Sequence, residues 1–195
     1  TINHFFPSLE SMKSLILLIS ILLTTTSSFA LTLGIGAVAS DKMNTSSSNN
    51  ESVHDDMGEG LVLRIGGDIT SNEKRAHSLE LEITGLLFEE DDRKLYLNTN
   101  MLNYTYTRFF ENHMFLSGGL GAGVSIGNID KDINDLGLGF TYQTIAKTGF
   151  HFWDQSILIG VAYRWLNYAD LKLGNSTIVD SGDNHLIALE ATFRF

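Results

Sequence analysis

Cysteine is absent from the 195-residue sequence, and proline occurs only once, at Pro7. Without cysteine, the chain has neither a disulfide framework nor a cysteine for lipid attachment. The long proline-free stretch suits strands that pair on both sides, because proline removes a hydrogen-bond donor from the ladder. After Ala30 no apolar run reaches the roughly 18 residues that a membrane-spanning helix needs, so a helical membrane protein is excluded.

The N-terminal region has the layout of a secretory signal. Lys13 precedes an apolar run over residues 14–23, and a short polar stretch ends at Ser28-Phe29-Ala30. This order predicts cleavage after Ala30. The alternative is a membrane anchor, but the run is too short to cross about 30 Å of hydrocarbon as a helix. We therefore expect residues 1–30 to be upstream residues plus a cleavable signal peptide, and residues 31–195 to be one exported domain.

The residues after Ala30 alternate between apolar and small or polar side chains, which is the period of a strand. Leu120, Ala122 and Val124, for example, alternate with Gly121 and Gly123. Eight such segments occur, at about 31–40, 60–69, 78–87, 97–109, 114–126, 136–152, 156–165 and 187–195. A membrane barrel reads as segments of about ten residues in an even number. The predicted fold class is therefore all-β, an eight-stranded antiparallel up-and-down transmembrane β-barrel.

The predicted connections alternate in length. In chain order they are long (41–59), short (70–77), intermediate (88–96), very short (110–113), intermediate (127–135), short (153–155) and long (167–183). Outer-membrane barrels have long loops outside and short turns on the periplasmic side. The order thus predicts that the first strand starts in the periplasm.

The four longer connections carry the net charge of the chain, which is −10. They contain 15 acidic and 5 basic residues: Asp41, Glu51, Asp55, Asp56, Glu59, Glu89, Glu90, Asp91, Asp92, Asp130, Asp132, Asp135, Asp170, Asp180 and Asp183 against Lys42, Arg93, Lys94, Lys131 and Lys172. An acidic exterior argues against a nucleic-acid partner, whose phosphates require a basic face.

Ionisable residues also occur on the minor face of the strands, which would point into the barrel. They are Arg64, Asp68, Glu80, Glu82, Lys147, Arg164, Glu190 and Arg194. The interior of an eight-stranded barrel is just filled by side chains, so these four bases and four acids are expected to pair in a lumen ion-pair network. A gated polar path is the alternative, but an open aqueous channel normally needs more strands.

Several segments carry a family resemblance. The stretch from Phe140 to Asp170, which contains Tyr163-Arg164-Trp165, resembles the penultimate hairpin of the opacity-protein and OmpA-like outer-membrane barrels. The closing segment from Leu189 to Phe195 is similar to their terminal strand, and the glycine-rich segment from Phe115 to Val124 to their fifth strand. The resemblance implies location in the bacterial outer membrane, contact with outer-membrane lipids and lipopolysaccharide, and Phe195 as the signal presented to the barrel assembly machinery.

No cofactor or metal site is predicted. Gly34, Gly36 and Ala39 fit a loose dinucleotide pattern, but the match lies inside a strand and no helix follows it. The six histidines lack metal-site spacing. The acidic run 89–92 lacks the pattern of a calcium-binding loop.

One enzyme family shares this architecture, the eight-stranded lipid A deacylases, which carry a His-x-Ser pair. The corresponding place here, residues 164–167, holds neither histidine nor serine, and His185 has no serine two residues on, so a nucleophile and its base are missing. The sequence therefore predicts a non-enzymatic integral outer-membrane protein with a structural and surface-interaction role, adhesin- or antigen-like, in which acidic loops meet host or surface ligands. A lipid-modifying barrel enzyme and a small-solute porin are the alternatives.

Overall fold

The structure is a computed structural model that describes residues 30–41, 44–46, 52–54, 57–90, 93–129, 136–173, 176–179 and 181–195. The predicted signal peptide lies almost wholly outside these residues. Among the described residues there is no helix long and apolar enough to span a membrane.

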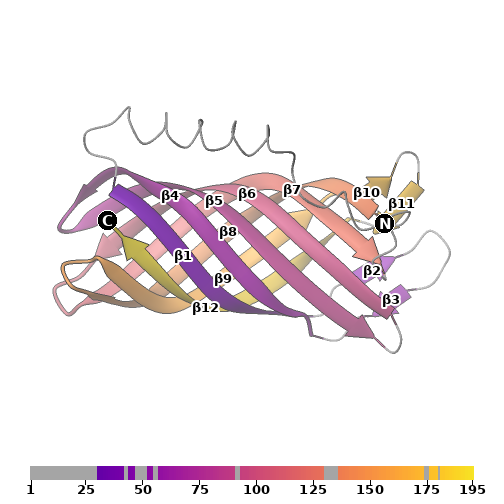
Figure 1. The fold of residues 1–195 in the computed structure, drawn as a ribbon, viewed down its shortest axis with the longest axis horizontal. Coiled ribbons are helices and arrows are strands. Elements are labelled where there is room, and N and C mark those ends of the chain that lie inside the picture. Colours follow the sequence, from indigo (N-terminus) through magenta and orange to yellow (C-terminus); the bar gives the residue numbers. More distant parts are fainter. Residues whose placement is uncertain are drawn as a thin grey trace, which may run out of the picture.

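Eight long strands form the barrel wall, and four short strands extend two of the connections (Figure 1). The long strands are β1 (Ala30–Ser40), β4 (Glu59–Asn72), β5 (Arg75–Glu90), β6 (Arg93–Phe109), β7 (Met114–Ile129), β8 (Leu136–Phe152), β9 (Ile157–Tyr168) and β12 (Gly182–Arg194). The short strands are β2 (Asn44–Ser46), β3 (Ser52–His54), β10 (Leu171–Leu173) and β11 (Ser176–Val179).

Each long strand pairs antiparallel with its neighbours in the chain, and β1 pairs with β12 to close the sheet. The closure can be followed through the register from Ser40, which pairs with Leu186. The circuit continues through residues 164, 145, 119, 105, 78 and 68 and returns to β1 at Ala30, ten residues from residue 40. Such a stagger tilts the strands relative to the barrel axis (Figure 1). The prediction of an eight-stranded antiparallel barrel is confirmed.

The two ends of the barrel differ in their connections. At one end, here named the turn end, the strands join through residues 73–74, 110–113 and 153–156. The other end, named the loop end, carries the hairpins β2–β3 and β10–β11. In outer-membrane barrels the turn end faces the periplasm and the loop end faces outward.

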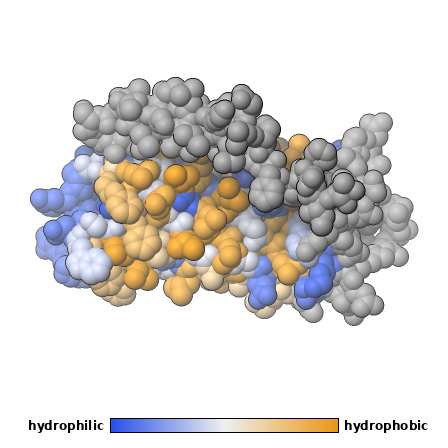
Figure 2. All heavy atoms as spheres, in the orientation of Figure 1, coloured by the Kyte–Doolittle hydropathy of each residue, from blue (hydrophilic) through white to orange (hydrophobic). Residues whose placement is uncertain are grey.

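The outer wall is apolar. Leu120, Phe140, Val161 and Leu189, which the alternation predicts to face lipid, are 65, 57, 48 and 64 % exposed. Hydrophobic side chains cover the middle of the visible wall, and hydrophilic ones gather at the turn end (Figure 2). Exposed Trp153 and Phe195 lie at the turn end, as aromatic residues do at a membrane interface.

The predicted connection over residues 88–96 is wrong. β5 continues to Glu90 and β6 begins at Arg93, so Leu87 pairs with Tyr96 and Glu89 with Lys94. The side chains of Glu89 and Lys94 form an ion pair across the two strands. Charged residues that suggest a loop in the sequence are thus cross-strand partners. Other strands are also longer than predicted. The connection predicted at 70–77 shrinks to residues 73–74, and the one predicted at 127–135 shrinks to residues 130–135. The last connection, predicted at 167–183, lies between Tyr168 and Gly182.

Candidate functional site

The buried interior of the barrel has three layers along its axis. The layer at the loop end is mainly apolar but includes buried hydroxyl and amide side chains, the middle layer is ionic, and a small apolar cluster lies near the turn end beside further polar side chains. The loop-end layer consists of Val38, Leu86, Phe88, Leu95, Leu97, Met101, Ala162, Leu166, Tyr168, Leu171, Leu186 and Ala188. The turn-end layer consists of Ala76, Phe109, Phe115 and Leu158.

Six of the eight predicted lumen residues meet in the middle layer. Arg64 on β4 donates to Glu80 on β5, with Nη1 3.0 Å from Oε2, and to Glu190 on β12, with Nη2 2.8 Å from Oε2. Arg164 on β9 donates to Glu82 on β5, with Nη2 2.9 Å from Oε2, and also to Glu190. These contacts connect four strands across the interior.

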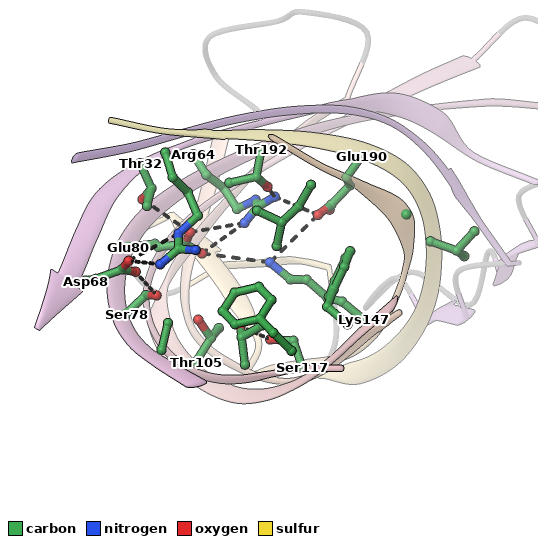
Figure 3. Close-up of a pocket in the computed structure, with 18 residues that line it drawn as sticks. Thr32, Arg64, Asp68, Ser78, Glu80, Thr105, Ser117, Lys147, Glu190 and Thr192 are labelled. Carbon is green, nitrogen blue, oxygen red and sulfur yellow. Dashed lines mark hydrogen bonds and ion pairs between the residues drawn. The ribbon is translucent and has the colours of Figure 1, made fainter. Parts of the chain in front are cut away.

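Lys147 on β8 is the sixth member of this layer. Its Nζ lies 3.8 Å from an oxygen of Glu80 and 3.7 Å from an oxygen of Glu190, so it contributes charge at longer range than the two arginines do (Figure 3). Three cations therefore face three carboxylates in the layer. A balance of this kind compensates buried charge, which would otherwise be expensive.

The remaining two predicted lumen residues form a separate pair nearer the turn end. Arg194 donates to Asp68, and its guanidinium lies over the ring of Phe109, 5.1 Å from the centroid. Ser78 donates to the other oxygen of Asp68 at 2.6 Å. The structure thus divides the predicted network into a group of six and a group of two.

Neutral polar side chains complete the ionic layer. Gln143 Nε2 donates to Glu82 at 3.0 Å and to Asn103 at 2.9 Å. Glycines allow the large side chains to fit: a Cβ on Gly34 would lie 2.8 Å from Nη2 of Arg64. A cavity of about 40 Å³ remains beside Lys147, lined by Ser78, Thr105 and Ser117 among others (Figure 3). This volume holds no more than a few water molecules.

Both ends of the lumen are covered by side chains from connections. At the loop end Leu171, which follows β9, is fully buried against Gly137 of β8. A Cβ added to Gly137 would lie 2.9 Å from the Cβ of Leu171. At the turn end Gln155 Nε2 donates to the carbonyl of Glu73 at 2.7 Å, and Arg194 donates to Gln155 Oε1 at 3.2 Å. The interior therefore provides a filled, charge-balanced core.

The outer wall carries a polar cluster at the loop end, on the face that points away from the lumen. Here named the rim cluster, it consists of Tyr163 and Trp165 on β9 and Asp183 and His185 on β12. Trp165 Nε1 donates to Asp183 Oδ2 at 3.0 Å, and His185 Nδ1 lies 2.6 Å from the hydroxyl of Tyr163. The sequence pattern gives no sign of this cluster, since His185 has no serine two residues on and its partners become neighbours only through strand pairing.

Two histidines, His77 and His185, face outward, and the ring of each contacts a tyrosine hydroxyl and not a serine or threonine hydroxyl. The ring of His185 meets the phenol of Tyr163, and the ring of His77 meets that of Tyr104 at 2.6 Å. In the part of the chain that the structure describes, no hydrogen bond joins a histidine ring to a serine or threonine hydroxyl, and no group of three histidine or acidic residues could hold a metal ion.

Comparison with known proteins gives matches only at the level of three-dimensional structure. No protein-family model and no curated protein matches the sequence. Neisserial surface protein A (NspA) superposes with a TM-score of 0.61 at 11 % identity, covering 85 % of this chain and 97 % of that one. Ail, the attachment invasion locus protein of Yersinia pestis, in complex with the heparin analogue sucrose octasulfate, gives 0.54 at 16 % identity, covering 86 % and 99 %.

The chain has the fold of the bacterial outer-membrane β-barrels. A weaker likeness, to the outer membrane enzyme PagL, has a TM-score of 0.44 at 12 % identity and covers 84 % of this chain and 98 % of that one. At the level of fold, the solved structures agree with the resemblance to opacity and OmpA-like proteins.

Proposed function

We propose that this outer-membrane barrel is a non-enzymatic structural protein whose acidic loop end binds partners at the cell surface, in an adhesin- or antigen-like role. The observation that carries the proposal is the division of the molecule into a filled interior and a charged loop end. The charges of the interior are paired, and the cavity left beside Lys147 measures only about 40 Å³, which is too small for a solute to pass. This arrangement argues against the porin alternative, since a pore needs a water-filled lumen.

The rim cluster argues against the lipid-modifying alternative. Acyl transfer by a barrel enzyme requires a hydroxyl or thiol nucleophile within hydrogen-bond reach of its base. The base-like His185 instead contacts the phenol of Tyr163, and the chain has no cysteine. Among the described residues the elements of a Ser-His site are therefore not assembled.

The charge of the loop end indicates the kind of partner. The structure described for Ail contains a sulfated heparin analogue, which is a polyanion. The loops of the present chain and the strand ends beside them carry 15 acidic and 5 basic residues, among them the exposed Asp41, Glu59 and Glu89. Like charges repel, so the partner of this loop end is a basic surface of a host or neighbouring-cell protein and not a sulfated glycan.

The proposal is tested with whole cells that either lack or display the protein. We expect the displayed protein to increase retention on immobilised matrix and serum proteins, and we expect this gain to fall as salt is raised, because ions screen exposed charges beyond about 10 Å at 0.1 M. A variant with amides in place of Glu89, Glu90, Asp91 and Asp92 should lose much of the gain, and deletion of residues 45–52 should alter it.

The control for this experiment is surface display itself. Both variants must show the same heat-modifiable mobility and the same amount in the outer-membrane fraction as the wild type. Equal retention of cells with and without the protein, or preferential retention on heparin, would contradict the proposal.

A further inference from the structure

The rim cluster lies where the apolar wall meets the loop end. Trp165 and His185 are directly paired in the β9–β12 register, and Asp183 is two residues from His185 on the same face. Along the wall from the cluster toward the turn end, the next outward residues are Ile187, Leu189 and Val161, all exposed and apolar. An amphiphile of the surrounding leaflet therefore meets this cluster with its headgroup while its chain lies on apolar wall.

The carboxylate of Asp183 is held by a hydrogen bond to only one of its two oxygens. Its Oδ2 accepts from the indole of Trp165 at 3.0 Å, whereas Nε2 of His185 lies 3.6 Å away, beyond a normal hydrogen bond. Its Oδ1 accepts no hydrogen bond from the described residues. The Asp183 side chain is 51 % exposed, so this oxygen can accept from a group outside the protein.

Aromatic rings lie beside this carboxylate: the indole of Trp165 contacts it, and the imidazole of His185 lies between it and Tyr163. The rings of Tyr163 and His185 are stacked, with centroids 5.9 Å apart and planes at 25°. Tyr163 and Trp165 are each about two-fifths exposed. A second carboxylate, that of Asp41 at the end of β1, accepts from the backbone N–H of His185 at 2.9 Å. Exposed aromatic faces beside carboxylates are the surroundings that bind ammonium groups, through attraction to the ring faces and to the negative charge.

We propose that the rim cluster binds the ammonium headgroup of a membrane amphiphile, with Asp183 as the anionic partner and the ring of Trp165 beside it as the aromatic wall. The same carboxylates repel phosphate, so the cluster distinguishes an amine-bearing headgroup from a purely phosphorylated one. This site shares Asp41 and Asp183 with the acidic loop end, but its ligand is a lipid and its assay uses an amphiphile, so either proposal can fail without the other.

The chain supplies its own reporter, because Trp153 and Trp165 are its two tryptophans. The Trp153→Phe variant, refolded in neutral maltoside micelles, leaves fluorescence from Trp165 alone. Titration with dodecyltrimethylammonium should change this fluorescence in a saturable way, whereas dodecyl phosphate should not. Asp183→Asn keeps an oxygen for the indole but removes the charge, and we expect it to weaken ammonium binding about tenfold or more, as loss of a charge-assisted contact does.

Glu89→Gln is the matched control, since it removes one acidic charge from the loop end on β5, away from the β9–β12 pair that carries the rim cluster. It should leave ammonium binding unchanged. Equal binding by the Asp183→Asn variant, an equal response to dodecyl phosphate, or equal potency of the chain-free tetramethylammonium ion would each overturn the assignment to an ammonium-bearing lipid. Unchanged heat-modifiable mobility of the variants ensures that the comparison is made between folded barrels.

Discussion

Arg164 on β9 reaches across the lumen to Glu82 on β5, with Nη2 2.9 Å from Oε2. Both side chains are almost completely buried, with exposed fractions of 1 % and 0 %. Because neither charge can be resolvated where it lies, each depends on the other. The pair therefore holds two separate parts of the barrel wall in register.

Removing one partner of this pair should be expensive. Glu82→Gln or Arg164→Met leaves an uncompensated buried charge, and we expect a loss of about 3 to 5 kcal/mol in the free energy of unfolding. The measurement is reversible denaturant unfolding in lipid vesicles. Glu89→Gln is the control, because its partner Lys94 is exposed and solvent-exposed ion pairs contribute little to stability. Equal effects at the two sites would show that the lumen pair is hydrated.

A charge placed on the outer wall tests the orientation of the strands. Val161→Arg should cost about 2 to 4 kcal/mol if the site lies near the bilayer midplane, whereas Val161→Leu should be almost neutral. Spin labels at residues 120, 140, 161 and 189 should be accessible to a lipid-soluble relaxant, and labels at residues 64, 82, 147 and 164 should be protected. The reverse accessibility would refute the orientation.

Two glycines on neighbouring strands should respond differently to the same substitution. A Cβ on Gly60 of β4 would lie 1.8 Å from the carbonyl oxygen of Gly85, so Gly60→Ala requires the backbone to move and should cost about 1 to 3 kcal/mol. A Cβ on Gly85 of β5 would meet nothing within 4 Å, so Gly85→Ala should be tolerated. Comparing the two unfolding midpoints checks this; equal destabilisation would contradict the packing at Gly60.

Asp170, in the connection after β9, should titrate below the ordinary range of an aspartate. The backbone N–H of Ser181 donates to its Oδ1 at 2.9 Å and lowers the pKa of Asp170. A lowered folded-state pKa means that this contact stabilises the connection at neutral pH and is lost as pH falls through that pKa. The amide resonance of Ser181 should follow this titration, and the titration should be absent in Asp170→Asn. A midpoint at or above the ordinary value would contradict the contact.

The sequence predicts the wall of the barrel well where one face is apolar and the other small or polar. In β7 and β8 the alternation places Leu120 and Phe140 outside and Gly121 and Gln143 inside, as the structure does. Strand order follows from the short connections. The bulkiest ionic residues of the interior can also be predicted from the sequence, because a charged residue on the small or polar face of an alternating strand points into the barrel.

The loop-end half is less predictable because the alternation disappears there. Leu86 and Phe88 point into the apolar layer while Leu87 faces the other way, so consecutive apolar residues carry no period. Leu171 closes this end of the lumen because it packs against Gly137, and this contact joins residues that are far apart in the chain. The rim cluster is equally non-local, since Trp165 and Asp183 become neighbours only through strand pairing.

We infer that the filled lumen leaves the outer surface as the functional part of the molecule. Planar-bilayer recording of the refolded barrel tests whether the lumen is closed. The paired charges and the small cavity of the interior predict a quiet membrane, with no stable conductance steps at any protein concentration that inserts folded barrels. Reproducible steps carried by the wild-type barrel would show an open path through the Arg164–Glu82 layer and would refute a filled lumen.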